Sequence, residues 1–141
     1  MRELAKRFAS ELSPENFQVA SLDAMPFADE SFDWVICNAV MHFANDRVQF
    51  DCWLAEQWRV LKPGGAFFAR LASSVGIEEL LVPTSAGRYL MPDGSERFVV
   101  DEQILRDVTE AVGGNFLEPI KTTNVENLRC MTTWVLVKGV S

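Results

Sequence analysis

His42 is the residue of this 141-residue sequence best suited to proton transfer, and it is the only histidine. An unperturbed imidazole titrates near neutrality, so a histidine beside a substrate can act as a general base. A structural histidine that only forms hydrogen bonds is the more common alternative. We therefore hold His42 as a catalytic candidate and assign no catalytic partner to it.

The three cysteines do not form a metal-binding pattern. Cys37, Cys52 and Cys130 are widely spaced, whereas a zinc site needs four ligands, commonly with close pairs such as C-x-x-C. We expect no metal site and three reduced, mostly buried thiols in a cytoplasmic protein.

The charge balance argues against nucleic-acid partners, and the lack of a long apolar run argues against a membrane. Thirteen Lys and Arg against 20 Asp and Glu give a formal charge of −7, which repels phosphate backbones, although a local basic groove would escape this argument. No stretch approaches the roughly 20 apolar residues that cross a bilayer. The first six residues lack the apolar region of an export signal, which again indicates the cytoplasm.

Hydrophobic periodicity predicts alternating helices and strands in the first half of the chain. The run 34–37 is continuously apolar, as in a parallel strand buried on both faces. Pro63 and the two glycines that follow it end the helix expected at 46–61. The expected elements are a helix at 2–12, strands at 17–22 and 33–38, a helix at 46–61 and a strand at 66–71.

The second half predicts a turn, a helix and a closing pair of strands. Met91–Ser95 has strong turn residues, and Asp101 and Gly113 suit the two ends of a helix. The expected elements are extended arms at 88–90 and 97–100, a helix at 101–112, and two antiparallel strands around 126–127, the second at 131–137. Such alternation indicates a single α/β domain, 1–141, with helices on both faces of a sheet.

Three segments in this order carry a family resemblance. They are Leu22–Phe27 followed by Asp29–Asp33, then Asn38–Phe43, then Trp58–Gly65. Together they resemble the small-molecule branch of class I S-adenosylmethionine-dependent methyltransferases, the group related to quinone-biosynthesis methyltransferases. The resemblance covers residues 1–73 well and the closing strand pair more loosely.

The resemblance implies a Rossmann-like sheet, mostly parallel, with an antiparallel C-terminal hairpin. The strand expected at 17–22 corresponds to the family's third, so the family's first two strands and glycine-rich loop would precede Met1, and no G-x-G pattern occurs in this sequence. We therefore expect a truncated domain with an unpaired strand edge. An apolar edge of this kind invites pairing, so either the strands at 17–22 and 33–38 become neighbours or the chain forms a homodimer.

The same resemblance assigns a cofactor site for S-adenosylmethionine. Asp23 would accept a hydrogen bond from the adenine amino group, the Ala24 amide would meet a ring nitrogen, and Met25 would line the adenine face. Asp23 shaping a turn is the alternative, and Met25 as ordinary core is another.

The strand end at Asn38, Ala39 and Val40 would pass beside the sulfonium, where small residues allow close approach. A strand-to-helix turn capped by Asn38 is the alternative here. Some of the later aromatic and basic residues would face the substrate, namely Tyr89, Arg97, Arg129 and Trp134, although Trp134 is a better candidate for the core.

The resemblance implies methyl transfer from S-adenosylmethionine to an unidentified small molecule, weak or absent without the missing segment. The alternative is a non-catalytic, methyltransferase-like partner subunit.

Overall fold

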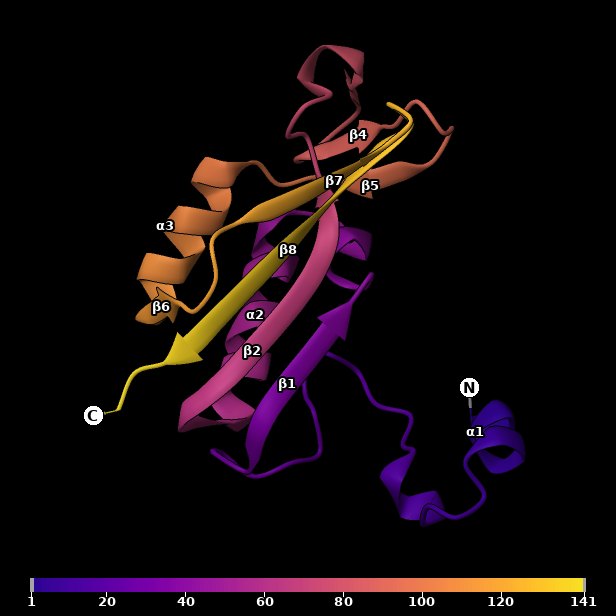
Figure 1. Cartoon of the computed structure of the whole chain (residues 1–141), viewed down its shortest axis with the longest axis vertical. Helices are drawn as coiled ribbons and strands as arrows, with labels where there is room; N and C mark the ends of the chain where they lie inside the picture. Colours follow the sequence, from indigo (N-terminus) through magenta and orange to yellow (C-terminus); the bar gives the residue numbers. More distant parts are fainter. Residues whose placement is uncertain (1, 141) are drawn as a thin grey trace.

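A five-stranded mixed sheet forms the centre of the molecule (Figure 1), in a computed structural model that describes residues 2–140. Its strands are β1 (Phe32–Asn38), β2 (Leu61–Ser73), β6 (Gly114–Phe116), β7 (Lys121–Val125) and β8 (Arg129–Lys138). The order is β1-β2-β8-β6, and β7 also pairs with β8. β1 and β2 are parallel, whereas β8 is antiparallel to β2, β6 and β7.

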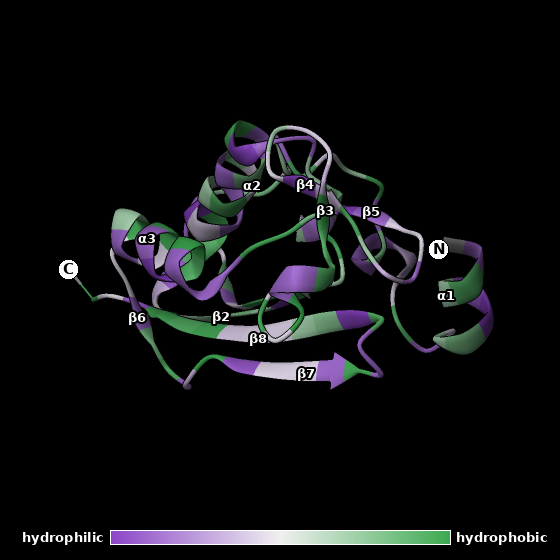
Figure 2. Cartoon of the chain, turned by 90° about the horizontal axis from the view of Figure 1, so that it is seen from above, coloured by the Kyte–Doolittle hydropathy of each residue, from purple (hydrophilic) through white to green (hydrophobic). Residues whose placement is uncertain are grey.

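Two helices, α2 (Arg47–Val60) and α3 (Glu102–Val112), cover the same face of this sheet (Figure 2). Each begins at an aspartate whose side chain accepts a hydrogen bond from a backbone N–H three residues later, Asp46 for α2 and Asp101 for α3. α3 ends at Gly113, whose φ of 70° suits glycine.

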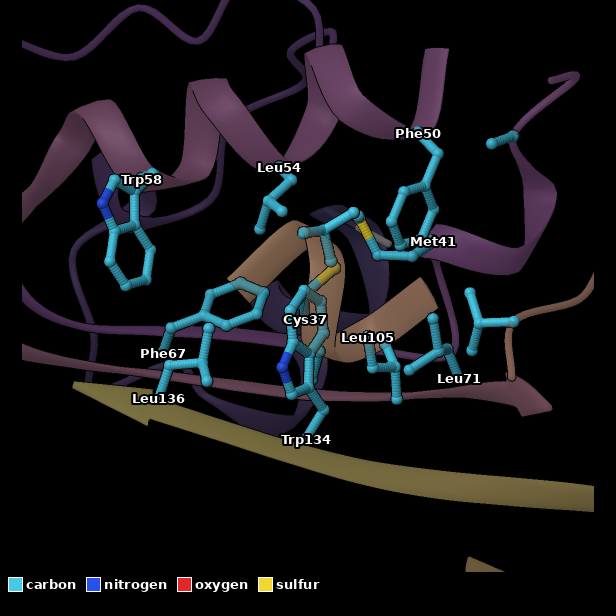
Figure 3. Close-up of a cluster of buried hydrophobic side chains, with 14 of the residues drawn as sticks. Cys37, Met41, Phe50, Leu54, Trp58, Phe67, Leu71, Leu105, Trp134 and Leu136 are labelled. Carbon is cyan, nitrogen blue, oxygen red and sulfur yellow. The ribbon is translucent and has the colours of Figure 1, made fainter. Parts of the chain in front are cut away.

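The main core fills the space between these helices and the sheet (Figure 3). The Phe67 and Trp134 rings meet edge to face with centroids 5.3 Å apart. The large, almost fully buried side chains are Phe50 and Leu54 from α2, Leu105 from α3, and Phe67, Leu71, Trp134 and Leu136 from the sheet.

A smaller three-stranded sheet lies beyond one end of the main sheet. It consists of β3 (Val82–Pro83), β4 (Arg88–Leu90) and β5 (Glu96–Phe98), all antiparallel. A second apolar cluster, including Ile77, Leu81 and Met91, packs it against β2 and β8.

Residues 2–140 also contain three short 3₁₀ helices. They are Pro14–Asn16, Met41–Phe43 and Glu78–Leu80.

Much of the predicted element order is confirmed. The helices expected at 46–61 and 101–112 form, the arms around 91–95 are β4 and β5, and the closing strands are the antiparallel pair β7 and β8. Their turn holds Glu126 and Asn127 at φ of 53° and 58°. The α/β class and the antiparallel hairpin are therefore as expected.

The strand predicted at 17–22 is wrong. That segment contains no strand, and its only pairing is an isolated bridge between Ser21 and Ala24. Val19 is 86% exposed, and no strand of the described chain lies beside the segment. Without a neighbour to satisfy its backbone, an alternating pattern does not make a strand. The collapsed sheet, with this segment beside β1, is therefore excluded, and β1–β2 is the only parallel pair among residues 2–140.

The prediction that helices bury the sheet on both faces is also wrong. Trp34 and Ile36 of β1 are 56% and 70% exposed, because no helix in the described chain covers the face opposite α2 and α3. The N-terminal helix, α1 (Arg2–Phe8), is shorter than predicted. It lies apart from the sheet, and Phe8 remains exposed.

Candidate functional site

A cavity of about 300 Å³ lies where β1 and β2 end and β8 begins. We call it the His42 cavity. Ala39 follows β1, Arg70 and Ala72 belong to the last part of β2, and Arg129 opens β8. The turn between β4 and β5 closes the other side with Met91, Asp93 and Ser95, next to Arg97 of β5. The carboxyl ends of parallel strands are the usual location of ligands in open α/β sheets.

His42 lies in the wall of this cavity with its side chain almost fully buried. Its Nδ1 accepts a hydrogen bond of 3.1 Å from the Ala72 N–H. Burial, followed by the charges of Arg97 and Arg70, lowers the pKa of His42 to about 4. The ring is therefore neutral at pH 7 and carries its proton on Nε2, which makes it a hydrogen-bond donor and disfavours the general-base interpretation.

The strand end 38–40 has an unusual backbone. Ala39 has a φ of 58°, and its N–H donates to the Arg70 carbonyl at 2.8 Å. A β-branched residue would be strained at this φ, so a small residue suits the position. Ala39 lines the His42 cavity, whereas Asn38 and Val40 are exposed outside its lining.

The Asp23 segment is a turn attached to α2. Asp23 Oδ1 accepts from the Trp53 indole N–H at 2.9 Å, and Oδ2 accepts from the Ser21 hydroxyl at 3.1 Å. The Ala24 N–H closes the turn onto the Ser21 carbonyl at 3.3 Å. The turn-shaping role that the sequence left open for Asp23 is thus present in the structure.

Arg59 organises the loop that follows this turn, a role that the sequence did not reveal. Its guanidinium donates to the carbonyls of Met25 and Phe27, and it forms ion pairs with Asp29 and Glu56. Glu56 in turn accepts from the Met25 N–H at 2.8 Å, and its hydrogen bond to Arg59 lowers the pKa of that carboxyl. The loop is therefore fixed on α2 through charged hydrogen bonds.

One residue from each group of predicted cofactor residues lines a cavity, and the two cavities are different. Met25 lines a second cavity of about 470 Å³ with Leu22, Phe27 and Phe32, whereas Ala39 lines the His42 cavity. The sequence placed these two groups at the ends of two adjacent strands. The first group, 23–25, lies in a turn instead, whereas the second group, 38–40, lies at the end of β1. Their roles toward a cofactor stay predictions.

Two of the four predicted substrate-facing residues line the His42 cavity. They are Arg97 and Arg129, whereas Tyr89 is outside its lining and Trp134 is fully buried in the core. The sequence did not indicate Arg70, Asp93 or Ser95. Arg70 belongs to β2, whereas Asp93 and Ser95 lie in the turn between β4 and β5, so only the tertiary fold brings Arg70 to the other two.

Across residues 2–140, no group of three His, Cys, Asp or Glu side chains is placed to hold a metal ion. In the same part of the chain, no helix is both long and apolar enough to cross a bilayer. Cys37 and Cys130 are buried and Cys52 is exposed, all as free thiols.

Solved structures define the class of this fold. A methyltransferase dependent on S-adenosylmethionine from Methanosarcina mazei matches with a TM-score of 0.73 at 17% identity, covering 89% of this chain and 68% of that chain. The 1,6-didemethyltoxoflavin-N1-methyltransferase of Burkholderia thailandensis, solved with bound 1,6-didemethyltoxoflavin and S-adenosylhomocysteine, matches with a TM-score of 0.70 at 15% identity, covering 98% of this chain and 56% of that chain. The chain has the fold of class I S-adenosylmethionine-dependent methyltransferases, as the resemblance predicted.

Sequence comparison finds a similarity to the same class of enzyme over the first half of the chain. Residues 1–69 match the model of the methyltransferase domain family. The biotin biosynthesis bifunctional protein BioHC of Teredinibacter turnerae is 29% identical over 98 residues, which are 70% of this chain and 16% of that protein. The chain is thus similar to a small part of a much longer curated relative.

Proposed function

We propose that this domain transfers the methyl group of S-adenosylmethionine to a small molecule bound in the His42 cavity. One observation carries the proposal. Ala39 belongs to the strand end assigned to the sulfonium, and it is also a wall of the cavity that contains His42 and the three arginines. A donor beside Ala39 and an acceptor in this cavity would be neighbours, and methyl transfer requires that proximity.

The residues present suit two parts of S-adenosylmethionine. Asp23 is exposed, and each of its carboxylate oxygens accepts only one hydrogen bond within the described chain, so each can accept another, such as one from an adenine amino group. At the strand end, the small side chain of Ala39 would allow a methionyl group to approach the backbone of 38–40. The Ala24 amide fits less well, because it already donates within its turn.

S-adenosylmethionine, when bound, supplies a methyl group on a sulfonium, and the acceptor's nucleophilic atom would bond to that methyl carbon in line as the C–S electron pair passes to sulfur. The chain's own residues would position the acceptor and exclude water. His42 would donate from Nε2 to an acceptor oxygen, and the buried Met91 and Met131 would keep that part of the cavity dry. No residue is assigned as a base.

Cofactor affinity of the 141-residue chain should be low, because the residues proposed here would contact adenine and the methionyl group but not the ribose. Amide chemical shifts suit weak binding and locate it. With S-adenosylhomocysteine as the probe, we expect shifts concentrated at 23–25 and 38–40.

The Asp23→Asn substitution tests the adenine contact. A charge-assisted hydrogen bond contributes about 1.5 kcal/mol or more, so the dissociation constant should rise about tenfold. Glu30→Gln, which neutralises an exposed carboxylate elsewhere in the same loop, should leave it unchanged. A folded chain with no shifts in either segment up to the solubility limit of the probe would contradict the proposal and favour the non-catalytic partner subunit.

A further inference from the structure

Three arginines from distant parts of the chain converge on the His42 cavity. Arg70 comes from β2, Arg97 from β5 and Arg129 from the first residue of β8. None of them forms an ion pair within the described chain. Four other arginines do pair with Asp or Glu, namely Arg47, Arg59, Arg88 and Arg106. Apart from Arg7 on α1, the arginines without an ion pair in the described part of the chain thus line this cavity.

One carboxylate, Asp93, shares this cavity but does not neutralise it. Its Oδ1 accepts from both the backbone N–H and the hydroxyl of Ser95. These bonds, helped by the charges of Arg97 and Arg129, lower the pKa of Asp93, so it carries a single negative charge. Because His42 is neutral, the cavity keeps an excess of positive charge in a chain whose formal charge is −7.

The rest of the lining limits the ligand to a small molecule with an apolar part. Ala39, Ala72, Met91 and Met131 supply apolar surface, and a volume of about 300 Å³ lies at the small end of ligand pockets. Planar guanidinium groups bind carboxylate and phosphate in a bidentate manner, which lysine cannot do.

We propose that the methyl acceptor is a small anionic molecule whose carboxylate or phosphate group is bound by Arg70, Arg97 and Arg129. The assignment of this anion as the acceptor rests on the proposed function, whereas anion binding itself does not. The positive charge would also favour entry of an anion into the cavity, despite the negative charge of the whole chain.

Binding of succinate and of inorganic phosphate to the full chain, without cofactor, tests the proposal. Amide shifts should appear around Ala39, Ala72 and Ser95, and the neutral dimethyl succinate should give none. Tighter binding of succinate would indicate a carboxylate acceptor, and tighter binding of phosphate a phosphorylated one. Because no cofactor is needed, failure here is distinct from failure of S-adenosylhomocysteine to bind.

Substitution of single arginines supplies the decisive comparison. We expect anion binding to weaken about tenfold in Arg129→Gln and in Arg97→Gln, the loss expected for a charged hydrogen bond. Arg129 is exposed, so its substitution should not affect folding. Arg129→Lys should lose less, and Arg106→Gln, an exposed arginine of α3, should change nothing. Equal binding of dimethyl succinate, or unchanged anion binding by Arg129→Gln, would overturn the proposal.

Discussion

His42 acquires its character from its surroundings more than from its residue type. The Ala72 N–H occupies Nδ1, and burial with two nearby arginines lowers the pKa of the imidazole to about 4. A histidine that remains neutral at physiological pH can donate from Nε2 without adding charge to the cavity. This leaves recognition of an anion to the guanidinium groups.

Acid titration should expose the low pKa of His42. In the unfolded chain the imidazole protonates near pH 6.5, whereas in the folded chain it does so near 4. The unfolded state therefore binds more protons in this window, and the free energy of unfolding should fall as pH decreases from about 6.5 to 4. The loss should be about 2–3 kcal/mol, from about 1.4 kcal/mol per pKa unit. His42→Asn, which keeps an acceptor for Ala72, should lack this contribution in urea unfolding at each pH. An imidazole that titrates near 6.5 by NMR would contradict the assignment.

The sequence identified some residues of the His42 cavity and missed others for a physical reason. His42 and Ala39 lie close to the strand end that the family segments mark, so they could be found. Arg70 looked like the end of an apolar strand, and nothing local connects it with Arg97 or Arg129. Their convergence depends on β8 lying antiparallel to β2, a register that sequence periodicity does not specify.

At the scale of elements, α3 is joined to the sheet through one buried hydrogen bond. The Trp134 indole N–H of β8 donates to Thr109 Oγ1 of α3 at 3.0 Å, and that hydroxyl donates to the Leu105 carbonyl at 2.6 Å. Trp134 and Thr109 are both buried, at 0% and 3% exposure. The threonine hydroxyl therefore satisfies an indole group that has no access to water.

Replacing Thr109 should test this connection. Thr109→Val keeps the shape but leaves the indole N–H unpaired in the core, so the free energy of unfolding should fall by about 1–3 kcal/mol. Thr109→Ser keeps the hydroxyl and should lose only about 1 kcal/mol, the contribution of one buried methyl group. Urea unfolding measures both. If the valine variant proved as stable as the serine variant, the hydrogen bond would contribute nothing to the packing of α3.

Elements with local signals were predictable, and an element that depends on a neighbour was not. Asp46 and Asp101 mark two helix starts, and the residues at 91–95 and 126–127 mark two turns, so those parts of the fold follow from the chain itself. The segment 17–22 has an alternating pattern but no adjacent strand. Its backbone therefore follows the Ser21–Ala24 turn instead.

At the scale of the whole molecule, β1 is an unpaired edge of the main sheet. It pairs with β2 on one side and with no strand of the described chain on the other. On the face away from α2 and α3, Ile36 lies beside Phe68 and is 70% exposed. An exposed apolar edge strand is a template for pairing with another strand.

We propose that a second copy of the chain covers this edge, because two β1 strands related by a twofold axis would satisfy each other's backbone groups and bury Trp34 and Ile36. Light scattering after size-exclusion chromatography should then give a dimer whose fraction rises with protein concentration. Ile36→Lys should shift it to monomer, since a charged edge side chain opposes pairing. Val48→Lys is the matched control, because Val48 is 71% exposed on α2, away from β1, and this variant should remain dimeric. A wild-type chain that stays monomeric at its highest soluble concentration would exclude this dimer. A dimer unaffected by Ile36→Lys would place the contact elsewhere.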